Sequence, residues 1–315
     1  MTKEYLLKLV ADFSENSPYN YLSPPADSEE SLLVQKKRFY ENNYSKHIYY
    51  EDAGDGSGLN AGKEERYYGL RFFLPPVMSV GSASDPGFLR LKDPQVVGPH
   101  HMMPEDWLPG AKTVVSFFLP YTEQVIESNR EDDTEPSPEW LYTRVEGQQM
   151  LLATGALIRD ALLAEGFRAV TPYTDDRFMM RVSPAEQGKP IPLFSSNWSE
   201  RHVGFVTGLG TFGRSTNFIS KAGACGRLIS VVTDWEPGPD EKDYEGIYDY
   251  CSDCGACYRA CPAGALSDEG KDIVKCSQFL AYIGKKYKPR YGCGKCQSGG
   301  PCATRAQRKK RKDQQ

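Results

Sequence analysis

The sequence lacks any long apolar run, and no stretch approaches the 18 residues that would suggest a membrane span. Its first twenty residues, MTKEYLLKLVADFSENSPYN, contain no continuous apolar core and no small-residue cleavage site. A broad basic field is also missing, because the net charge is −4, and this gives nucleic acid and anionic lipid little to bind. We therefore expect a cytoplasmic protein with no membrane partner.

Cysteine is almost absent from the first 250 residues, where Cys225 stands alone. The other eight cysteines fall between positions 251 and 302. In a chain without a secretion signal, this concentration favours metal ligation over disulfides. A lone cysteine is usually a small buried hydrophobe, so we assign Cys225 to packing.

The most specific pattern is CSDCGACYRACP, which has the C-x2-C-x2-C-x3-C-P spacing of bacterial ferredoxins. In that spacing the fourth cysteine ligates a second cluster, so a second group of cysteines is expected. We predict two [4Fe–4S] clusters with crossed ligation. The first set is Cys251, Cys254, Cys257 and Cys302, and the second set is Cys261, Cys276, Cys293 and Cys296. The alternative is structural zinc, but three evenly spaced cysteines followed by Cys-Pro are rare in zinc sites.

Upstream of the cysteines, strand and helix signals alternate, which predicts an α/β or α+β fold. Strands are expected at 113–119, 167–173 and 227–234, and helices are expected at 138–165 and 199–207. We divide the chain into an N-terminal region of uncertain structure (1–105), an α/β domain (106–240), a ferredoxin-like domain with two clusters (241–303) and a basic tail (304–315). The tail could contact phosphates, but a solvated terminus is favoured.

Two other patterns have ordinary explanations. GLGTFG, from Gly208 to Gly213, matches the G-x-G-x-x-G of dinucleotide-binding folds, but no strand precedes it and no long helix follows. The adjacent His100 and His101 cannot easily face one metal ion, and a place on a loop surface is favoured.

The run ERHVGFVTGLGTFGRSTNFISKAGACGRLISVVTDWEP, followed by the cysteines, CSQFLAYIG and YGCGKCQ, resembles the cobalamin-dependent epoxyqueuosine reductases. It resembles the corrinoid reductive dehalogenases more distantly. The likeness extends over about 106–302 and includes AKTVVSFFLPY and DALLAEGF. It implies a nitroreductase-like corrinoid-binding domain joined to a ferredoxin-like domain.

By the same resemblance, Glu200 and Arg201 match the Glu-Arg pair that precedes a helix in this family. The residues that it implies as corrinoid contacts are Arg201, Gly208, Gly210, Gly213, Arg214 and Asn217. Small residues in such a loop would let the backbone approach a flat macrocycle.

The sequence departs from the family in three places. The catalytic aspartate of the epoxyqueuosine reductases is replaced by Phe194, so the general acid is missing. Five residues separate Cys296 from Cys302, two more than is usual, and Pro301 precedes the last cysteine. The repeat domain that helps the tRNA reductases hold their substrate is also missing, so tRNA is not expected as a partner. Candidate proton donors are Tyr173, Asp175 and Asp176.

The sequence thus predicts an anaerobic, cytoplasmic oxidoreductase that passes electrons through two [4Fe–4S] clusters to cobalamin, which reduces an organic substrate. Its expected partner is a soluble low-potential donor such as ferredoxin or flavodoxin. The alternative is an electron-transfer protein that reduces the corrinoid of a partner corrinoid protein and has no organic substrate. A respiratory dehalogenase is disfavoured, because no twin-arginine signal is present.

Overall fold

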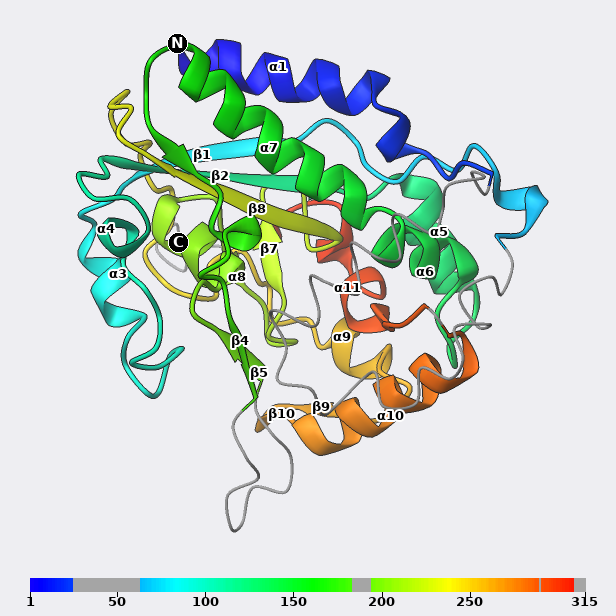
Figure 1. Cartoon of the computed structure of the whole chain (residues 1–315). Helices are drawn as coiled ribbons and strands as arrows, with labels where there is room; N and C mark the ends of the chain where they lie inside the picture. The colour runs from blue at the N-terminus through cyan, green and yellow to red at the C-terminus, as the bar shows by residue number, and fades with distance from the viewer. Residues whose placement is uncertain (25–62, 183–193, 289, 309–315) are drawn as a thin grey trace, which may run out of the picture.

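The computed structural model describes residues 1–24, 63–182, 194–288 and 290–308. At its centre lies a four-stranded antiparallel sheet with the order β1-β2-β8-β3 (Figure 1). The strands are β1 (Val77–Ser82), β2 (Thr113–Pro120), β3 (Ala169–Val170) and β8 (Gly226–Thr233). Every residue of β2 is buried, as expected for an apolar strand with a neighbour on each side. The predicted strands at 113–119 and 227–234 are confirmed.

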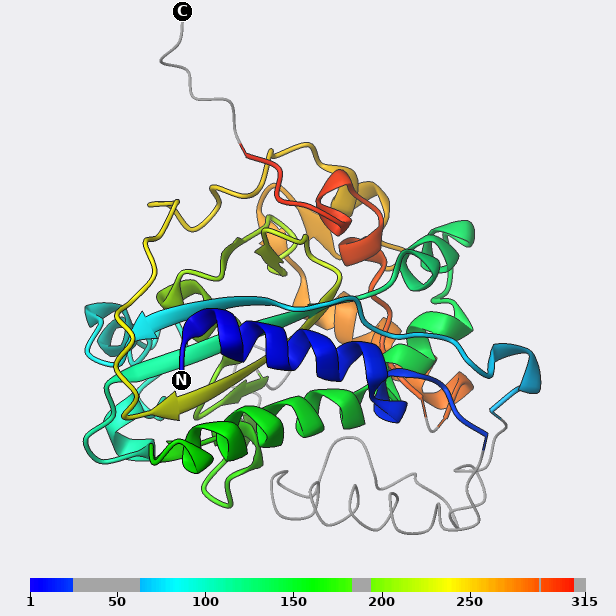
Figure 2. The ribbon, with the colours of Figure 1, turned by 90° about the horizontal axis from the view of Figure 1, so that it is seen from above.

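Helices cover both faces of this sheet. The helices α1 (Lys3–Asn16) and α7 (Gln148–Ala164) lie side by side over one face, and α8 (Glu200–Thr207) packs on the other (Figures 1 and 2). Alternate residues of β8 point to opposite faces, so Ile229 joins the core beneath α7 while Val232 joins the core beneath α8. The mixed helix and strand architecture confirms the predicted fold class, and β1 extends the sheet into the region before residue 106.

The sequence predicted a single helix over 138–165. This prediction is wrong, because two helices occupy the range. α6 (Pro138–Val145) ends one turn before α7 begins at Gln148. Gly147 lies between them, and a Cβ atom there would come within 2.3 Å of the Thr143 carbonyl oxygen. The close approach requires glycine and changes the direction of the chain.

The remaining elements are short and lie around the sheet. The helices are α3 (Pro86–Arg90), α4 (Pro104–Trp107), α5 (Glu123–Glu131), α9 (Ala256–Arg259), α10 (Ile273–Lys286) and α11 (Lys295–Ser298). Three hairpins pair β4 (Met180–Val182) with β5 (Phe194–Ser196), β6 (Gly210–Phe212) with β7 (Phe218–Ser220), and β9 (Leu266–Ser267) with β10 (Gly270–Lys271). The 3-10 turns are η1 (Pro18–Asn20), η3 (Glu65–Tyr67), η4 (Pro172–Thr174) and η5 (Pro301–Ala303).

The cysteine-rich segment packs directly against the sheet domain. The backbone N–H of Ala224 donates to the Cys302 carbonyl at 2.8 Å, and that of Cys225 donates to the Ala303 carbonyl at 3.1 Å. These bonds hold η5 beside the start of β8. Cys225 is 0% exposed within the main core, so the predicted packing position is confirmed.

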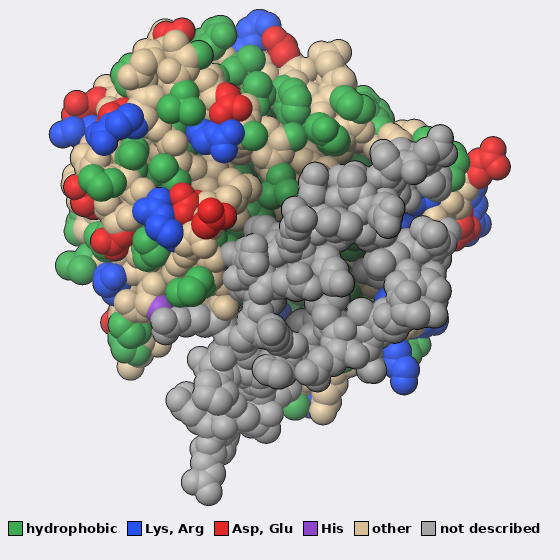
Figure 3. Space-filling model, in the orientation of Figure 1, with side chains coloured by type: hydrophobic (Ala, Val, Ile, Leu, Met, Phe, Trp, Pro, Cys, Tyr) green, Lys and Arg blue, Asp and Glu red, His purple; other side chains and the backbone are tan. Residues whose placement is uncertain are grey.

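On the face seen in Figure 3, Lys and Arg side chains are interspersed with Asp and Glu wherever described residues are visible. No single-sign charged field covers this face. Within the described ranges, no helix has both the length and the apolar character needed to cross a bilayer.

The β6–β7 hairpin provides a test of this packing. A Cβ atom at Gly210 would lie 2.2 Å from the Ile219 carbonyl oxygen, so Gly210→Ala must displace the partner strand. We expect a loss of about 1–3 kcal/mol in the free energy of unfolding, measured by urea denaturation of the apoprotein. Gly213→Ala is the matched control, because its Cβ would meet only the flexible Ile219 side chain, 3.0 Å away. Equal effects of the two changes would contradict this account.

Candidate metal centre and the adjoining polar site

The first predicted set of cysteines surrounds one cavity. Cys251, Cys254 and Cys257 reach it from the loop before and within α9, and Cys302 reaches it from η5. Three of these residues lie close together in the sequence, whereas Cys302 arrives from the far end of the described chain. The longer spacing before Cys302 therefore does not separate it from the set.

The second predicted set also lies together, although its members come from three elements. The Cys293 and Cys296 thiols flank the start of α11, Cys276 lies on α10, and Cys261 follows α9. Burial, together with the charges of Cys296 and Cys261, raises the pKa of Cys293 to about 12. Burial likewise raises the pKa of Cys296, and both Cys276 and Cys261 contribute. Cys261 thus lies near the distant cysteines, as the predicted crossed ligation requires.

Two buried thiols of the first set resist ionisation. Burial, followed by the charges of Cys302, Cys296 and two other cysteines, raises the pKa of Cys257 to about 12. The pKa of Cys302 rises to about 11 for the same reasons. Four thiolates can share this space only when a cationic centre replaces their protons.

The spacing of the sulfurs is relevant to the zinc alternative. Four cysteines on one Zn²⁺ place their sulfurs about 3.8 Å apart, given Zn–S bonds of about 2.3 Å. Among the described residues, no three His, Cys, Asp or Glu side chains approach closely enough to hold a single metal ion. Each cysteine of a cubane binds a different iron.

The GLGTFG glycines have local structural roles, and their corrinoid contacts stay a prediction. Gly208 ends α8 in the left-handed conformation with φ 97°, where a side chain would be strained. Gly210 allows β6 to approach β7, and Gly213 donates its N–H to the Asn217 carbonyl at 2.9 Å. Glycine is therefore explained here by a helix cap and a tight hairpin.

The polar residues of the same block contact the cysteine sets. Arg214 makes two bonds to the Asp253 carboxylate, at 2.6 and 2.9 Å, and its guanidinium lies 4.8 Å from the Tyr248 ring centroid. Asp253 has φ 63°, so the ion pair holds an unusual loop conformation between two cysteines of the first set. The Nδ2 group of Asn217 donates to Cys296 Sγ at 3.1 Å. Both residues were predicted as corrinoid contacts, which stays a prediction, and in this structure both adjoin the cysteine sets.

A buried lysine that the sequence analysis missed lies between two cysteines of the second set. Lys295 is 3% exposed, and its Nζ donates to the carbonyls of Asn129, at 2.7 Å, and Asp132. Asn129 also donates to the Cys293 carbonyl at 3.2 Å, and Arg130 donates to the Ser298 carbonyl at 2.6 Å. The end of α5 thus anchors the CGKC loop and accepts hydrogen bonds from its Lys295 ammonium.

Beside the second set, polar side chains gather along an edge of β8. The strand β3 pairs only with Val232 and Thr233, so no described strand covers this edge from Gly226 to Val231. We call the residues here the β8-edge group: Arg144, Gln148, Tyr173, Glu200, Arg201 and Arg227. Burial raises the pKa of Tyr173. The charges of Tyr291 and Glu200 also raise this pKa, whereas the cations of Arg227 and Arg144 lower it. These groups are therefore electrostatic neighbours of the Tyr173 hydroxyl.

Arg201 connects the β8-edge group to the second cysteine set. Its side chain is exposed and donates to the Thr216 carbonyl at 3.2 Å. Desolvation by the surrounding protein, followed by the Arg144 cation, lowers the pKa of Arg201, whereas the Cys296 sulfur raises it. Of the six predicted corrinoid contacts, Arg201 is the one that belongs to the β8-edge group.

Glu200 is a titratable group whose importance the sequence analysis missed. Its Oε2 accepts a bond from Ser230 Oγ at 2.7 Å, and Trp198 Nε1 donates to the same hydroxyl at 2.9 Å. The buried Oε1 has no partner among the described residues. Burial raises the pKa of Glu200 to about 7, while the Ser230 hydroxyl lowers it. A polar Ser230 within the apolar run LISVV was the available sequence signal.

The three predicted proton donors differ in their surroundings. Asp175 forms an ion pair with Arg177 at 2.7 Å, and this bond lowers its pKa, so Asp175 remains ionised and is a poor donor. Asp176 lies beside it on the exposed surface. Tyr173 remains the candidate that adjoins the β8-edge group. The side chain of Phe194 lies outside the described part of the structure.

His101 corrects a second expectation, because it is fully buried and does not lie on the surface. Its ring stacks on Trp198 with centroids 5.5 Å apart, and burial lowers its pKa to about 3. The ring is therefore neutral at physiological pH and acts as a packing residue. His100 bonds Ser195 Oγ at 2.7 Å.

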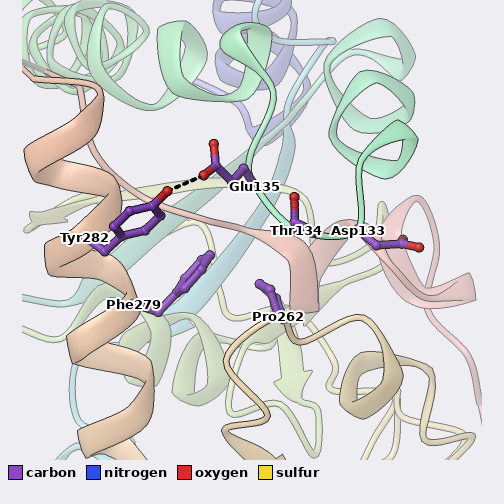
Figure 4. A pocket seen from close by; sticks show the side chains of 6 residues that line it. All are labelled: Asp133, Thr134, Glu135, Pro262, Phe279 and Tyr282. Carbon is purple, nitrogen blue, oxygen red and sulfur yellow. Dashed lines mark hydrogen bonds between the residues drawn. The ribbon is translucent and has the colours of Figure 1, made fainter.

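A shallow pocket of about 330 Å³ lies between α10 and the loop after α5 (Figure 4). Its lining residues are Asp133, Thr134, Glu135, Pro262, Phe279 and Tyr282. Glu135 accepts bonds from Tyr282 at 2.6 Å, from Lys286 at 2.6 Å and from Tyr287. These bonds lower the pKa of Glu135 to about 2, so the carboxylate anchors α10 and is not available for proton transfer.

Comparison with known proteins gives two kinds of relative. A 4Fe-4S binding domain family matches residues 244–267. A tetrachloroethene reductive dehalogenase of Desulfitobacterium hafniense is 41% identical over 105 residues, which are 31% of this chain and 19% of that protein. An epoxyqueuosine reductase of Leadbetterella byssophila is 28% identical over 121 residues, 35% of this chain and 37% of that protein. The matches thus span well under two thirds of these relatives' lengths.

Solved structures give the same two names. A crystal structure of epoxyqueuosine reductase aligns over 72% of this chain and 61% of that one, with a TM-score of 0.46 and 20% identity. A reductive dehalogenase structure, described with a mechanism for B12-dependent dehalogenation, aligns over 71% of this chain and 29% of that one, with a TM-score of 0.42 and 16% identity. The predicted resemblance to this superfamily is confirmed by the sequence relatives, and the chain is an iron–sulfur protein related to them.

The Arg214–Asp253 pair yields a prediction about one cluster. Arg214→Ala removes the ion pair that holds the loop between Cys251 and Cys254, so we expect iron bound by the first set to be lost several-fold faster to a chelator under anoxic conditions. The second set should keep its iron, as judged by Mössbauer spectroscopy. The control is Arg159→Ala, which removes an Arg–Asp surface pair on α7. Parallel loss from both sets would contradict this role for Arg214.

The burial of Glu200 yields a prediction about pH. Its pKa is raised from 4.5 to about 7, so the folded protein retains a proton there that the unfolded chain has released. This contribution to stability is present below pH 4.5 and disappears as the pH rises through about 7; it amounts to roughly 3 kcal/mol at most. Infrared difference spectra should show a protonated carboxyl that titrates near pH 7 and vanishes in Glu200→Gln. The exposed control Glu241→Gln should leave that band in place, and a band that survives in Glu200→Gln would refute the assignment.

Proposed function

We propose that this protein is a reductase that passes electrons through two [4Fe–4S] clusters to a corrinoid, and that the corrinoid reduces an organic substrate beside Tyr173. The observation that carries the proposal is the position of Cys296. This residue of the second set is an electrostatic neighbour both of Cys257 in the first set and of Arg201 in the β8-edge group.

The cysteines fit the proposed clusters. Each set supplies four sulfurs, the full ligand number of a cubane, and the pKa values of the buried thiols require positive charge to make them thiolates. Asn217 supplies an N–H···S bond to the second set, a contact that tunes the reduction potential of a cluster. The buried Lys295 ammonium favours the more negative, reduced state of the same cluster.

The β8-edge group fits a corrinoid in chemical terms. Corrinoids carry amide side chains, and Arg144 and Arg201 present guanidinium donors for amide oxygens. The buried Nε2 of Gln148 has no partner among the described residues and offers a further donor. When bound, the corrinoid would supply a strongly reducing cobalt centre.

Tyr173 is the proposed proton donor. Its raised pKa keeps the phenol protonated at neutral pH, and the neighbouring Arg227 and Arg144 cations stabilise the phenolate that remains after transfer. We exclude tRNA from the proposed substrates, because Phe194 stands where the related tRNA reductases have an acidic residue. The electrons would come from a soluble low-potential donor.

The proposal is tested with anoxically reconstituted protein. We expect about eight irons per chain, an EPR signal of base-off cob(II)alamin, and turnover of an organohalide such as tetrachloroethene. Tyr173→Phe should reduce turnover by about 10²- to 10⁴-fold while the cluster and corrinoid spectra stay unchanged. The exposed Tyr5→Phe is the matched control. Zinc as the only metal, or a corrinoid that does not bind, would refute the proposal.

Cys225→Ala should leave the iron content of the reconstituted protein unchanged, because Cys225 is a buried packing residue outside both cysteine sets.

A further inference from the structure

Glu200 lies at the β8 edge with one carboxyl oxygen fixed and the other unbonded. Its Oε2 atom accepts a hydrogen bond from Ser230 Oγ at 2.7 Å, and Trp198 Nε1 donates to the same hydroxyl at 2.9 Å. The Oε1 atom is buried and has no partner among the described residues. In contrast, both oxygens of Glu135, which anchors α10, accept hydrogen bonds. Buried polar atoms are normally bonded, so the Oε1 atom of Glu200 needs an explanation beyond packing.

Few neighbours of the Tyr173 hydroxyl can exchange a proton with it at neutral pH. Besides burial, the groups that act on its pKa are Arg227, Tyr291, Arg144 and Glu200. An arginine stays protonated in proteins, and a tyrosine phenol releases its proton only near pH 10. Burial raises the pKa of Glu200 to about 7, so this carboxyl group can both hold and release a proton near neutral pH. Of these four groups, Glu200 is the one suited to return a proton to Tyr173.

Three histidines lie near the start of α8, and two of them do not titrate near pH 7. Burial lowers the pKa of His202 to about 4 and that of His101 to about 3. His100 bonds Ser195 Oγ at 2.7 Å and is a control in the experiments below. The arginines of the β8-edge group keep their charge throughout this range.

We propose that Glu200 is the proton store that reloads Tyr173 after each turnover. This inference rests on the proposed function. Replacing a halogen by hydrogen consumes two electrons, which the clusters deliver, and one proton. The carbon–halogen bond breaks, the halide leaves with its electron pair, and the new C–H bond takes its proton from Tyr173. The Tyr173 phenolate then takes the Glu200 proton, directly or through one water molecule, and the Glu200 carboxylate regains a proton from solvent.

The first test compares single and repeated turnovers of tetrachloroethene by the full-length, reconstituted protein. Glu200→Gln should complete its first turnover at the wild-type rate, because Tyr173 already carries a proton, and should then slow about 10²-fold. Tyr173→Phe should lose the first turnover as well. The exposed control Glu241→Gln should behave as the wild type. Equal steady rates of the wild type and Glu200→Gln, or a slow first turnover in Glu200→Gln, would overturn the inference.

The second test uses infrared difference spectroscopy and needs no bound corrinoid. As the pH rises through about 7, the Glu200 carboxyl band should disappear and a Tyr173 ring band should shift with it. The ring shift should be absent in Glu200→Gln and should persist in His100→Gln. Ser230→Ala removes a hydrogen bond that favours the ionised carboxylate, so both changes should move to higher pH. A Tyr173 ring band that ignores the titration of Glu200 would refute the proton store.

Together the two tests separate this inference from the proposed function. If the wild type binds no corrinoid or reduces no substrate, the proposed function fails, and the proton store fails with it. If the wild type turns over and Tyr173→Phe is slow, but Glu200→Gln shows no burst, only the proton store is refuted.

Discussion

The buried thiols of the two cysteine sets cannot ionise together without a compensating positive charge, and the rest of the cysteine-rich region is arranged around this constraint. Burial and mutual repulsion raise the pKa of Cys257 and Cys293 to about 12, so the groups favour a cationic metal centre. The protein contributes Asn217 as a hydrogen-bond donor to Cys296 and Lys295 as a buried cation. Both lower the cost of negative charge at the second set.

The same constraint explains why the cysteine-rich segment is held so firmly to the sheet domain. A cluster tolerates little movement of its ligands, and these ligands come from separate loops. Lys295 is held by α5, Glu135 holds α10, and Arg290 bonds Glu146 at 2.7 Å at the end of α6. Each contact joins a residue before position 150 to one after position 280. The sheet domain therefore acts as the frame that sets the distance between the cysteine sets.

Charged side chains also serve two different purposes in this structure. Cations with carboxylate partners, such as Arg214 and Arg177, maintain loop geometry. At the β8 edge, Tyr173 and Glu200 have raised pKa values and can hold protons near neutral pH.

Local patterns in the sequence determined the ferredoxin spacing, the apolar strands β2 and β8, and the superfamily resemblance, because each depends on residues at short, regular separations. The tertiary structure alone decided the partners of the isolated residues. It turned the GLGTFG glycines into a helix cap and a hairpin, paired Arg214 with Asp253, buried His101 and Lys295, and joined Glu200 to Ser230. These outcomes depend on contacts between residues distant in the chain, and no local pattern encodes which distant groups will meet when the core packs.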